Sequence, residues 1–266
     1  MKKIFYILTL MLVALTANAQ EDIQLSCPDD NHPHAIDLGL PSGTLWACCN
    51  VEADKPEAYG EYYAWGEIEE KNNYKWSYYI HCDGTRNTCH NLGSDIAGTQ
   101  YDVVHVKWGG FWFMPSKDQL SELLDYCNNE WITVNGVEGQ KFTSKANGSS
   151  IFLPAAGCRL SDHFENVGVY GYYWSSTQSS SYSYSACRLY FHSVLTVLED
   201  YGRGSGQTIR PVISTTTNIN LPGSSSDLSS QAIYNIYGIK VADIVADIST
   251  LPPGIYIQNG KKRVAR

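Results

Sequence analysis

Residues 172–191 run YYWSSTQSSSYSYSACRLYF, so that two aromatic segments enclose a stretch made mostly of serine and tyrosine. The segments 172–174 and 187–191 are short, rich in aromatic residues and bounded by Gly or Ser, which is typical of β-strands. This pattern predicts short strands joined by surface loops.

The same strand pattern lies on both sides of this stretch. Residues 151–153 precede Pro154, and residues 209–213 form a further short segment with β-branched residues. Across the 266 residues, aromatic side chains make up 12%, with 19 Tyr, and long amphipathic stretches are few. The fold class predicted from these features is α+β, with mixed antiparallel sheets, few helices and long loops.

One helix is clearly indicated after residue 115. Ser116 is followed three residues later by Gln119, which is the capping-box arrangement that satisfies the free amide groups of a helix N-terminus. An apolar stripe at the spacing of one helix face then follows, made by Leu120, Leu123, Leu124 and Cys127. We expect this helix to lie against a sheet with Cys127 on its buried face.

The N-terminus has the pattern of a cleavable signal peptide. Lys2 and Lys3 precede an almost unbroken apolar run over residues 4–15, and residues 17–19 (Ala-Asn-Ala) supply the small residues that a signal peptidase requires. The apolar run is shorter than the roughly 20 residues that a membrane-spanning helix needs. We therefore expect cleavage before Gln20 and export of the chain, with residues 20–33 as a polar leader.

The composition changes again near residue 215. Residues 215–230 are mostly Thr, Asn, Gly and Ser and are typical of a linker. Residues 231–266 resume an alternation of apolar and polar residues with Gly turns, which suggests small β-hairpins. The sequence thus predicts one domain over residues 34–214 and a short β segment behind it.

The charge of the chain argues against nucleic acid as a partner. The formal net charge is −8, and removal of residues 1–19 leaves 17 Lys+Arg against 27 Asp+Glu, a charge of −10. Binding to phosphates requires a concentrated basic face. The one basic cluster, residues 261–266, is a short tail that we interpret as solvated.

Eight cysteines in an exported chain favour disulfides, although the sequence cannot choose among the possible pairings. Cys82 and Cys89 are close enough to close a small loop and are the first predicted pair. Together with His81 and His90 they could instead supply four zinc ligands, but the spacing is not that of a common zinc motif. We favour the disulfide.

Several segments resemble, in order, one family of domains. They are residues 37–47 (DLGLPSGTLWA), 59–67 (YGEYYAWGE), 95–99 (DIAGT), 108–115 (WGGFWFMP), 152–159 (FLPAAGCR), 173–176 (YWSS) and Gly206 with 210–212 (RPV). Together they are similar to the Fibrobacter succinogenes major paralogous domain, which is frequent in exported proteins of Bacteroidota. The resemblance covers residues 35–213 and implies a fold similar to the C-type lectin-like domain, in which sheets support long variable loops.

The C-terminal segment, through residues 232–238 (AIYNIYG) and 251–257 (LPPGIYI) to Gly260, resembles the sorting domain of type IX secretion substrates. It is shorter than the usual sorting domain. This resemblance implies contact with outer-membrane secretion machinery and a location outside the cell or on its surface. If the segment does not sort the protein, we expect the chain to stop in the periplasm.

Motifs for catalysis are missing from the sequence. Metalloprotease, P-loop, dinucleotide, EF-hand and nucleophile-elbow spacings do not occur. Formylglycine-generating enzymes share the lectin-like scaffold and use cysteines, so Cys158 and Cys187 could be a catalytic pair, but both lie in strand-like segments that suit structural roles. The calcium-binding triplets of C-type lectins are not present around Pro154 or Pro211 either.

The loops around residues 172–174 and 179–205 are the predicted ligand face. Tyrosines there alternate with Ser, His and Arg, and Tyr provides rigid contact area with a polar tip, as in antibody paratopes. We predict a non-enzymatic binding or adhesion module without cofactor or metal, whose partner is an extracellular glycan, peptide or other host-surface ligand. The predicted ligand-binding residues are Tyr172, Trp174, Tyr182, Tyr184, Arg188, Tyr201 and Arg203.

Two alternatives to this function stay open. One is a degenerate enzyme on a scaffold like that of the formylglycine-generating enzymes. The other is a structural surface protein without a small ligand, in which the tyrosines merely cover a sheet.

Overall fold

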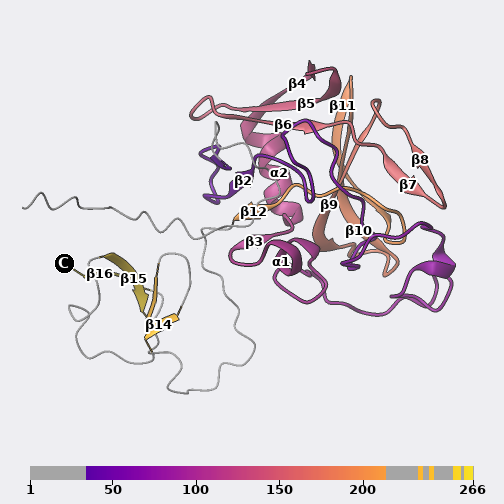
Figure 1. Cartoon of the computed structure of the whole chain (residues 1–266), viewed down its shortest axis with the longest axis horizontal. Coiled ribbons are helices and arrows are strands. Elements are labelled where there is room, and N and C mark those ends of the chain that lie inside the picture. Colours follow the sequence, from indigo (N-terminus) through magenta and orange to yellow (C-terminus); the bar gives the residue numbers. More distant parts are fainter. Residues whose placement is uncertain (1–33, 214–232, 236–239, 243–253, 259–260, 266) are drawn as a thin grey trace, which may run out of the picture.

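A computed structural model describes residues 34–213 and, further along the chain, the strand segments 233–235, 240–242, 254–258 and 261–265. The predicted signal peptide, leader and linker lie outside the described residues. Within residues 34–213 the elements are mostly short antiparallel strands, and long connections join them (Figure 1). The α+β class is therefore confirmed.

The first and last strands of this domain belong to one sheet. Strand β2 (Leu45–Ala47) pairs with β1 (Ala35–Asp37) on one side and with β12 (Val212–Ile213) on the other, and β12 in turn pairs with β3 (Trp112–Phe113). All pairs are antiparallel, in the order β1-β2-β12-β3. Of the predicted strand 209–213, only its last two residues are in β12.

A second sheet carries the stretch that encloses the serine and tyrosine loop. Strand β10 (Ser185–His192) lies between β9 (Gly171–Gln178) and β11 (Leu195–Gly202) (Figure 1). One face of the sheet joins the apolar cluster around helix α2, through Tyr173, Leu189 and Phe191. The two strands predicted within residues 172–191 are confirmed.

Helix α2 (Lys117–Tyr126) begins as the sequence predicts. The Ser116 hydroxyl accepts a hydrogen bond from the backbone N–H of Gln119 at 3.2 Å, and the Gln119 side chain accepts one from the Ser116 N–H at 2.8 Å. Leu120 and Leu123 are buried against the sheets, and Cys127, which ends the helix, is buried as well. The predicted capping box and apolar stripe are both confirmed.

Two hairpins complete the domain. Strands β4 (Cys127–Val134) and β5 (Val137–Ser144) are joined by Asn135 and Gly136, both at positive φ, and β6 (Ser150–Pro154) pairs with the far side of β5. Asn-Gly is the preferred pair for such a two-residue turn because both positions need positive φ. The smaller hairpin pairs β7 (Cys158–Leu160) with β8 (His163–Glu165).

Between β2 and β3 the chain has little regular structure. It contains a single 3₁₀ turn, η1 (Trp76–Tyr78), and the short helix α1 (Val103–Trp108). Its tryptophan Trp65 is fully buried in the central apolar cluster and donates a hydrogen bond to the Ser175 carbonyl at 2.8 Å. This long connection is therefore part of the core, and it reaches the end of the β9–β11 sheet.

The described C-terminal strands form a separate four-stranded antiparallel sheet. Its order is β14 (Lys240–Ala242), β13 (Ile233–Asn235), β15 (Gly254–Gln258) and β16 (Lys261–Ala265). The predicted β character of this segment is confirmed. No helix in the described part of the chain is long and apolar enough to cross a membrane.

Candidate functional site

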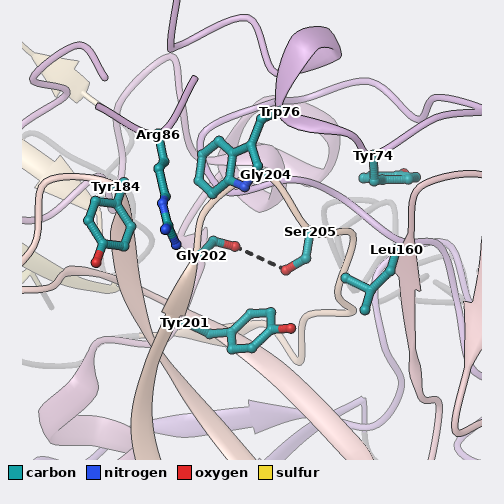
Figure 2. A pocket seen from close by; sticks show the side chains of 9 residues that line it. All are labelled: Tyr74, Trp76, Arg86, Leu160, Tyr184, Tyr201, Gly202, Gly204 and Ser205. Atoms are coloured by element: carbon teal, nitrogen blue, oxygen red, sulfur yellow. Dashed lines mark hydrogen bonds between the residues drawn. The ribbon is translucent and has the colours of Figure 1, made fainter. Parts of the chain in front are cut away.

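Part of the predicted ligand face surrounds a surface cavity of about 270 Å³. Figure 2 shows that its walls come from distant parts of the sequence: the η1 region, the loop before Cys89, the end of β7 and the segment that follows β11. It is lined by Tyr74, Trp76, Arg86, Leu160, Tyr184, Tyr201, Gly202, Gly204 and Ser205. We refer to it as the aromatic cavity.

Glycines spaced two apart allow two of the aromatic rings to lie directly on the backbone. A Cβ atom added to Gly202 or Gly204 would be 3.0 or 3.3 Å from the Trp76 indole, and one added to Gly206 would be 2.6 Å from the Tyr74 ring. Side chains at these positions would displace the rings. The Gly-x-Gly-x-Gly spacing of residues 202–206 therefore forms the glycine floor of the aromatic cavity.

Tyr184 and Tyr201 are the two predicted residues that line the aromatic cavity. Tyr184 meets Trp76 edge to face, with ring centroids 6.5 Å apart, and Tyr182 lies 5.4 Å from Tyr184 with 55% of its surface exposed. Tyr182 therefore extends the aromatic surface outward from the cavity. These contacts bring together three of the seven predicted residues.

The Arg86 guanidinium lies at the cavity, 5.5 Å from the centre of the Tyr184 ring. Arg86 belongs to the loop closed by the disulfide between Cys82 and Cys89, which we call the disulfide loop. Figure 2 shows the side chain reaching from this loop toward the cavity beside Tyr184 and Trp76. The predicted pair Cys82–Cys89 is thus confirmed, and the loop it closes contributes to the cavity wall.

Arg188 lies behind the cavity wall rather than in it. Its guanidinium is 3.6 Å from the centre of the Tyr201 ring and 4.3 Å from that of Tyr172, and its Nε donates to Glu199 at 2.9 Å. Tyr172 in turn stacks on Tyr190, with centroids 5.3 Å apart. Since Arg188 is only 5% exposed, this arginine stack supports Tyr201 instead of offering a free charge.

Two predicted ligand-binding residues, Trp174 and Arg203, are fully buried, so they do not form part of a surface in this structure. The Trp174 indole donates to the Tyr63 carbonyl at 2.9 Å. Arg203 donates to the Tyr79 hydroxyl and to the carbonyls of Ser183 and His90, at 2.9, 2.9 and 3.1 Å. Both belong to the framework that holds the cavity, because a buried polar group must be hydrogen-bonded.

Four residues of the aromatic cavity lie outside the predicted ligand face: Tyr74, Trp76, Arg86 and Leu160. The first three lie more than 100 residues before Tyr201 and meet it only through the fold. The regular glycines of residues 202–206 were the available signal, because glycine in an extended segment often marks a close approach of another group.

The cysteines other than the Cys82–Cys89 pair depart in part from the expectation of disulfides. Cys127, Cys158 and Cys187 are buried thiols. Burial raises the pKa of Cys158 to about 11, although Arg188 acts against it, and burial likewise raises the pKa of Cys187 to about 11. Such thiols are protonated at neutral pH and are poor nucleophiles.

Because Cys82 and Cys89 form a disulfide, their sulfur atoms are not available as ligands for the alternative zinc site. His81 bonds the Gly66 carbonyl at 2.8 Å, and His90 pairs with Asp83 at 3.2 Å. Among the residues that the structure describes, no group of three or more His, Cys, Asp or Glu side chains is placed to hold a metal ion.

The fold and the cavity define an α+β protein with an aromatic site at one end of a three-stranded sheet. A family model described as a domain of unknown function (DUF8237) matches residues 126–212. The match includes Leu160, Tyr184, Tyr201 and the glycine floor, but not the wall formed by Tyr74, Trp76 and Arg86. No curated protein and no solved structure matches the chain.

Proposed function

We propose that this protein is a non-enzymatic binding module that takes a saccharide into the aromatic cavity. The observation that supports this most directly is the set of four rings around one cavity, from Tyr74, Trp76, Tyr184 and Tyr201. Ligand sites are concave, mostly apolar or aromatic, and carry few polar groups. A sugar ring suits such a site because its C–H faces pack on aromatic rings while its hydroxyls bond to polar groups at the rim.

The polar groups at the cavity also suit a sugar. Ser205 is already occupied, since its hydroxyl donates to the Gly202 carbonyl at 3.1 Å and accepts from Gln207 at 3.0 Å. The Trp76 indole N–H and the Tyr201 hydroxyl make no hydrogen bond within the described part of the chain. Both are therefore available to a ligand rich in oxygen atoms.

The experiment is a glycan array probed with the full mature protein, followed by calorimetry on the best ligands. We expect Tyr184→Ala and Tyr201→Ala to weaken binding about tenfold or more, which is the range for truncation of an aromatic anchor residue. Tyr126→Ala is the matched control, because Tyr126 is 47% exposed at the end of α2 and does not line the cavity. Binding that survives both cavity substitutions would exclude this site.

The enzyme alternative has less support. Cys158 and Cys187 are on different sheets, in β7 and β10, and both have the raised pKa of buried thiols. Activation of a catalytic cysteine needs an exposed, electropositive setting that lowers the pKa. A structural surface protein without a ligand is the remaining alternative, and a glycan array and a peptide array that both stay blank would favour it.

We also propose that the binding module acts outside the cytoplasm. The signal-peptide pattern of residues 1–19 supports this, and so does the Cys82–Cys89 disulfide, since disulfides persist in oxidising compartments. The test is mass spectrometry of the protein recovered from culture fluid, outer membrane and periplasm. An N-terminus at Gln20 is expected, and removal of residues 231–266 should shift the protein to the periplasm if they act as a sorting signal.

A further inference from the structure

We propose that the saccharide is acidic, and that Arg86 binds its carboxylate or sulfate group at the rim of the aromatic cavity. This inference rests on the proposed function and adds the chemical class of the ligand. It assigns the sugar ring to Trp76 and Tyr201 and the anionic group to Arg86.

Arg86 is the charged residue among the nine that line the cavity. Its guanidinium contacts the Tyr184 ring, and no carboxylate of the described residues pairs with it. The nearest acidic residue in the same loop, Asp83, pairs with His90 instead. An exposed cation beside a cavity, with no counter-ion of its own, attracts an anion locally even though the chain as a whole is negatively charged.

The other arginines of this region differ from Arg86 because they have hydrogen-bond partners within the protein. Arg188 is buried and bonded to Glu199, and Arg203 is buried and donates to two carbonyls and a hydroxyl. Arg159 donates to the Lys71 carbonyl at 3.1 Å and lies over the Phe164 ring. These three arginines are thus held by partners within the fold, although Nε of Arg159 and Nη1 of Arg188 are buried without one. Among the described residues, the Arg86 guanidinium meets only the Tyr184 ring and remains open to a ligand.

The free hydrogen-bonding groups of the cavity also favour an acidic ligand. The guanidinium of Arg86 and the indole N–H of Trp76 can only donate, the free Tyr201 hydroxyl can donate or accept, and the Ser205 oxygen is already used within the protein. A site whose free groups are mainly donors selects a ligand that carries acceptors. Carboxylate and sulfate are the strongest acceptors that sugars carry, and an arginine can bind either one with two parallel hydrogen bonds.

The disulfide loop holds the backbone at Arg86 in place before a ligand arrives. Besides the Cys82–Cys89 bond, the His90 N–H donates to the His81 carbonyl at 2.7 Å and the Asp83 N–H to the Thr88 hydroxyl at 2.9 Å. The fully buried Arg203 ties the loop to the core through the His90 carbonyl. A binding group that is already ordered loses less conformational entropy on association, which increases affinity.

The test measures the binding of matched neutral and acidic sugars to the full mature protein by calorimetry. Galactose is compared with galacturonic acid, and N-acetylglucosamine with its 6-sulfate, so that the two arms separate carboxylate from sulfate. We expect at least one acidic sugar to bind about tenfold more tightly than its neutral counterpart, as a charged hydrogen bond would give. Higher salt should reduce this preference, because the charges are exposed to solvent.

Three variants make the result specific. Arg86→Gln should abolish the acidic preference, so that the two sugars of each pair bind with similar affinity, since it removes the charge that distinguishes them. Tyr201→Ala should weaken the binding of the neutral and the acidic sugar by the same factor. Lys55→Gln, whose lysine is 57% exposed and does not line the cavity, is the control for overall charge and should change nothing.

The outcomes separate this inference from the function on which it rests. If wild type binds neutral and acidic sugars equally, or Arg86→Gln keeps the acidic preference, the role of Arg86 is overturned while saccharide binding stands. If no sugar binds at all, or Tyr201→Ala binds as wild type does, the proposed function fails and this inference with it.

Discussion

The guanidinium group of Arg203 is fully buried, and three hydrogen bonds within the protein replace its contacts with water. The three groups that accept hydrogen bonds from Arg203 belong to segments around the aromatic cavity: Tyr79 after η1, Ser183 in the serine and tyrosine loop, and His90 after the disulfide loop. The guanidinium also lies 5.0 Å from the Trp65 ring. One side chain thus joins two points of the long β2–β3 connection to the loop between β9 and β10.

We predict that Arg203→Met lowers the free energy of unfolding by about 3 kcal/mol or more. Each hydrogen bond to a charged group contributes about 1.5–3 kcal/mol, and the substitution removes the donor from the buried Tyr79 hydroxyl and from the carbonyls of Ser183 and His90. Urea denaturation followed by tryptophan fluorescence measures the change. Arg86→Met is the matched control and should stay within about 0.5 kcal/mol of wild type, because Arg86 is exposed. Equal losses in the two variants would contradict the structural role of Arg203.

Glu61 is a second residue whose environment affects stability, because its surroundings raise the pKa of its carboxyl group. Burial and a hydrogen bond with Glu70 raise the pKa of Glu61 from its ordinary value of 4.5 to about 7, while Arg159 acts in the opposite direction. A carboxyl that binds its proton more tightly in the folded state stabilises the fold at low pH and loses that contribution as the pH rises.

We therefore predict that the free energy of unfolding contains a term that falls as the pH rises from about 4.5 to about 7. Glu61→Gln keeps a neutral side chain at every pH and should remove this term, so the difference between wild type and variant should change across that range. Urea denaturation at several pH values measures it. Glu130→Gln, which changes an exposed residue of β4, is the control. A constant difference between wild type and Glu61→Gln would show that Glu61 does not titrate in this way.

At the scale of elements, α2 depends on its first turn because it is short. The ten residues of Lys117–Tyr126 are fewer than the 12–15 that an isolated helix needs for marginal stability in water. The capping box at Ser116 and the packing of Leu120 and Leu123 therefore supply what length does not.

We predict that Ser116→Ala lowers the free energy of unfolding by about 1 kcal/mol, the usual cost of losing a serine N-cap. Ser121→Ala, in the same helix, serves as the control, because Ser121 makes only a long contact of 3.5 Å with Asp125. Thermal or urea unfolding of the two variants gives the comparison. A loss at Ser121 as large as that at Ser116 would mean that the cap is not the cause.

Elements with a local pattern were predictable from the sequence, and those without one were not. The capping box and periodic leucines indicated α2, and the aromatic segments of residues 172–191 indicated β9 and β10. Helix α1 was missed because its six residues depend on Asp102, whose side chain accepts from the N–H groups of Val104 and His105 and also from the distant Met114. A contact of that kind leaves no periodicity in the sequence.

The residues of the candidate site likewise include some that the sequence could predict and some that it could not. Tyr184 and Tyr201 could be selected because tyrosine, serine and glycine gather within one stretch of the chain. Trp76 and Arg86 could not, because their role depends on the glycine floor and on the disulfide loop meeting beside β11. Conversely, Trp174 and Arg203 have the residue types of a binding site but lie in the core, and composition does not distinguish these two cases.

At the scale of the whole molecule, the domain is closed by its last strand. Strand β12 lies between β2 and β3, so the sheet that holds the N-terminal strands is complete only when Val212 and Ile213 are in place. The buried thiols are spread over the other sheets, with Cys127 at the start of β4, Cys158 at the start of β7 and Cys187 in β10. Together they can report on whether the sheets unfold as one unit.

We predict that Cys127, Cys158 and Cys187 resist alkylation in the folded protein and become reactive together when it unfolds. All three are buried and have a raised pKa, so neither access nor thiolate is available in the native state. If the domain unfolds cooperatively, the three labelling rates should rise with urea along one common curve. Peptide mapping after iodoacetamide treatment without reductant measures each rate, with fully denatured protein as the control for intrinsic reactivity. Rapid labelling of Cys158 or Cys187 alone in the folded state would contradict the prediction, and it would supply the reactive thiol that an enzyme on this scaffold requires.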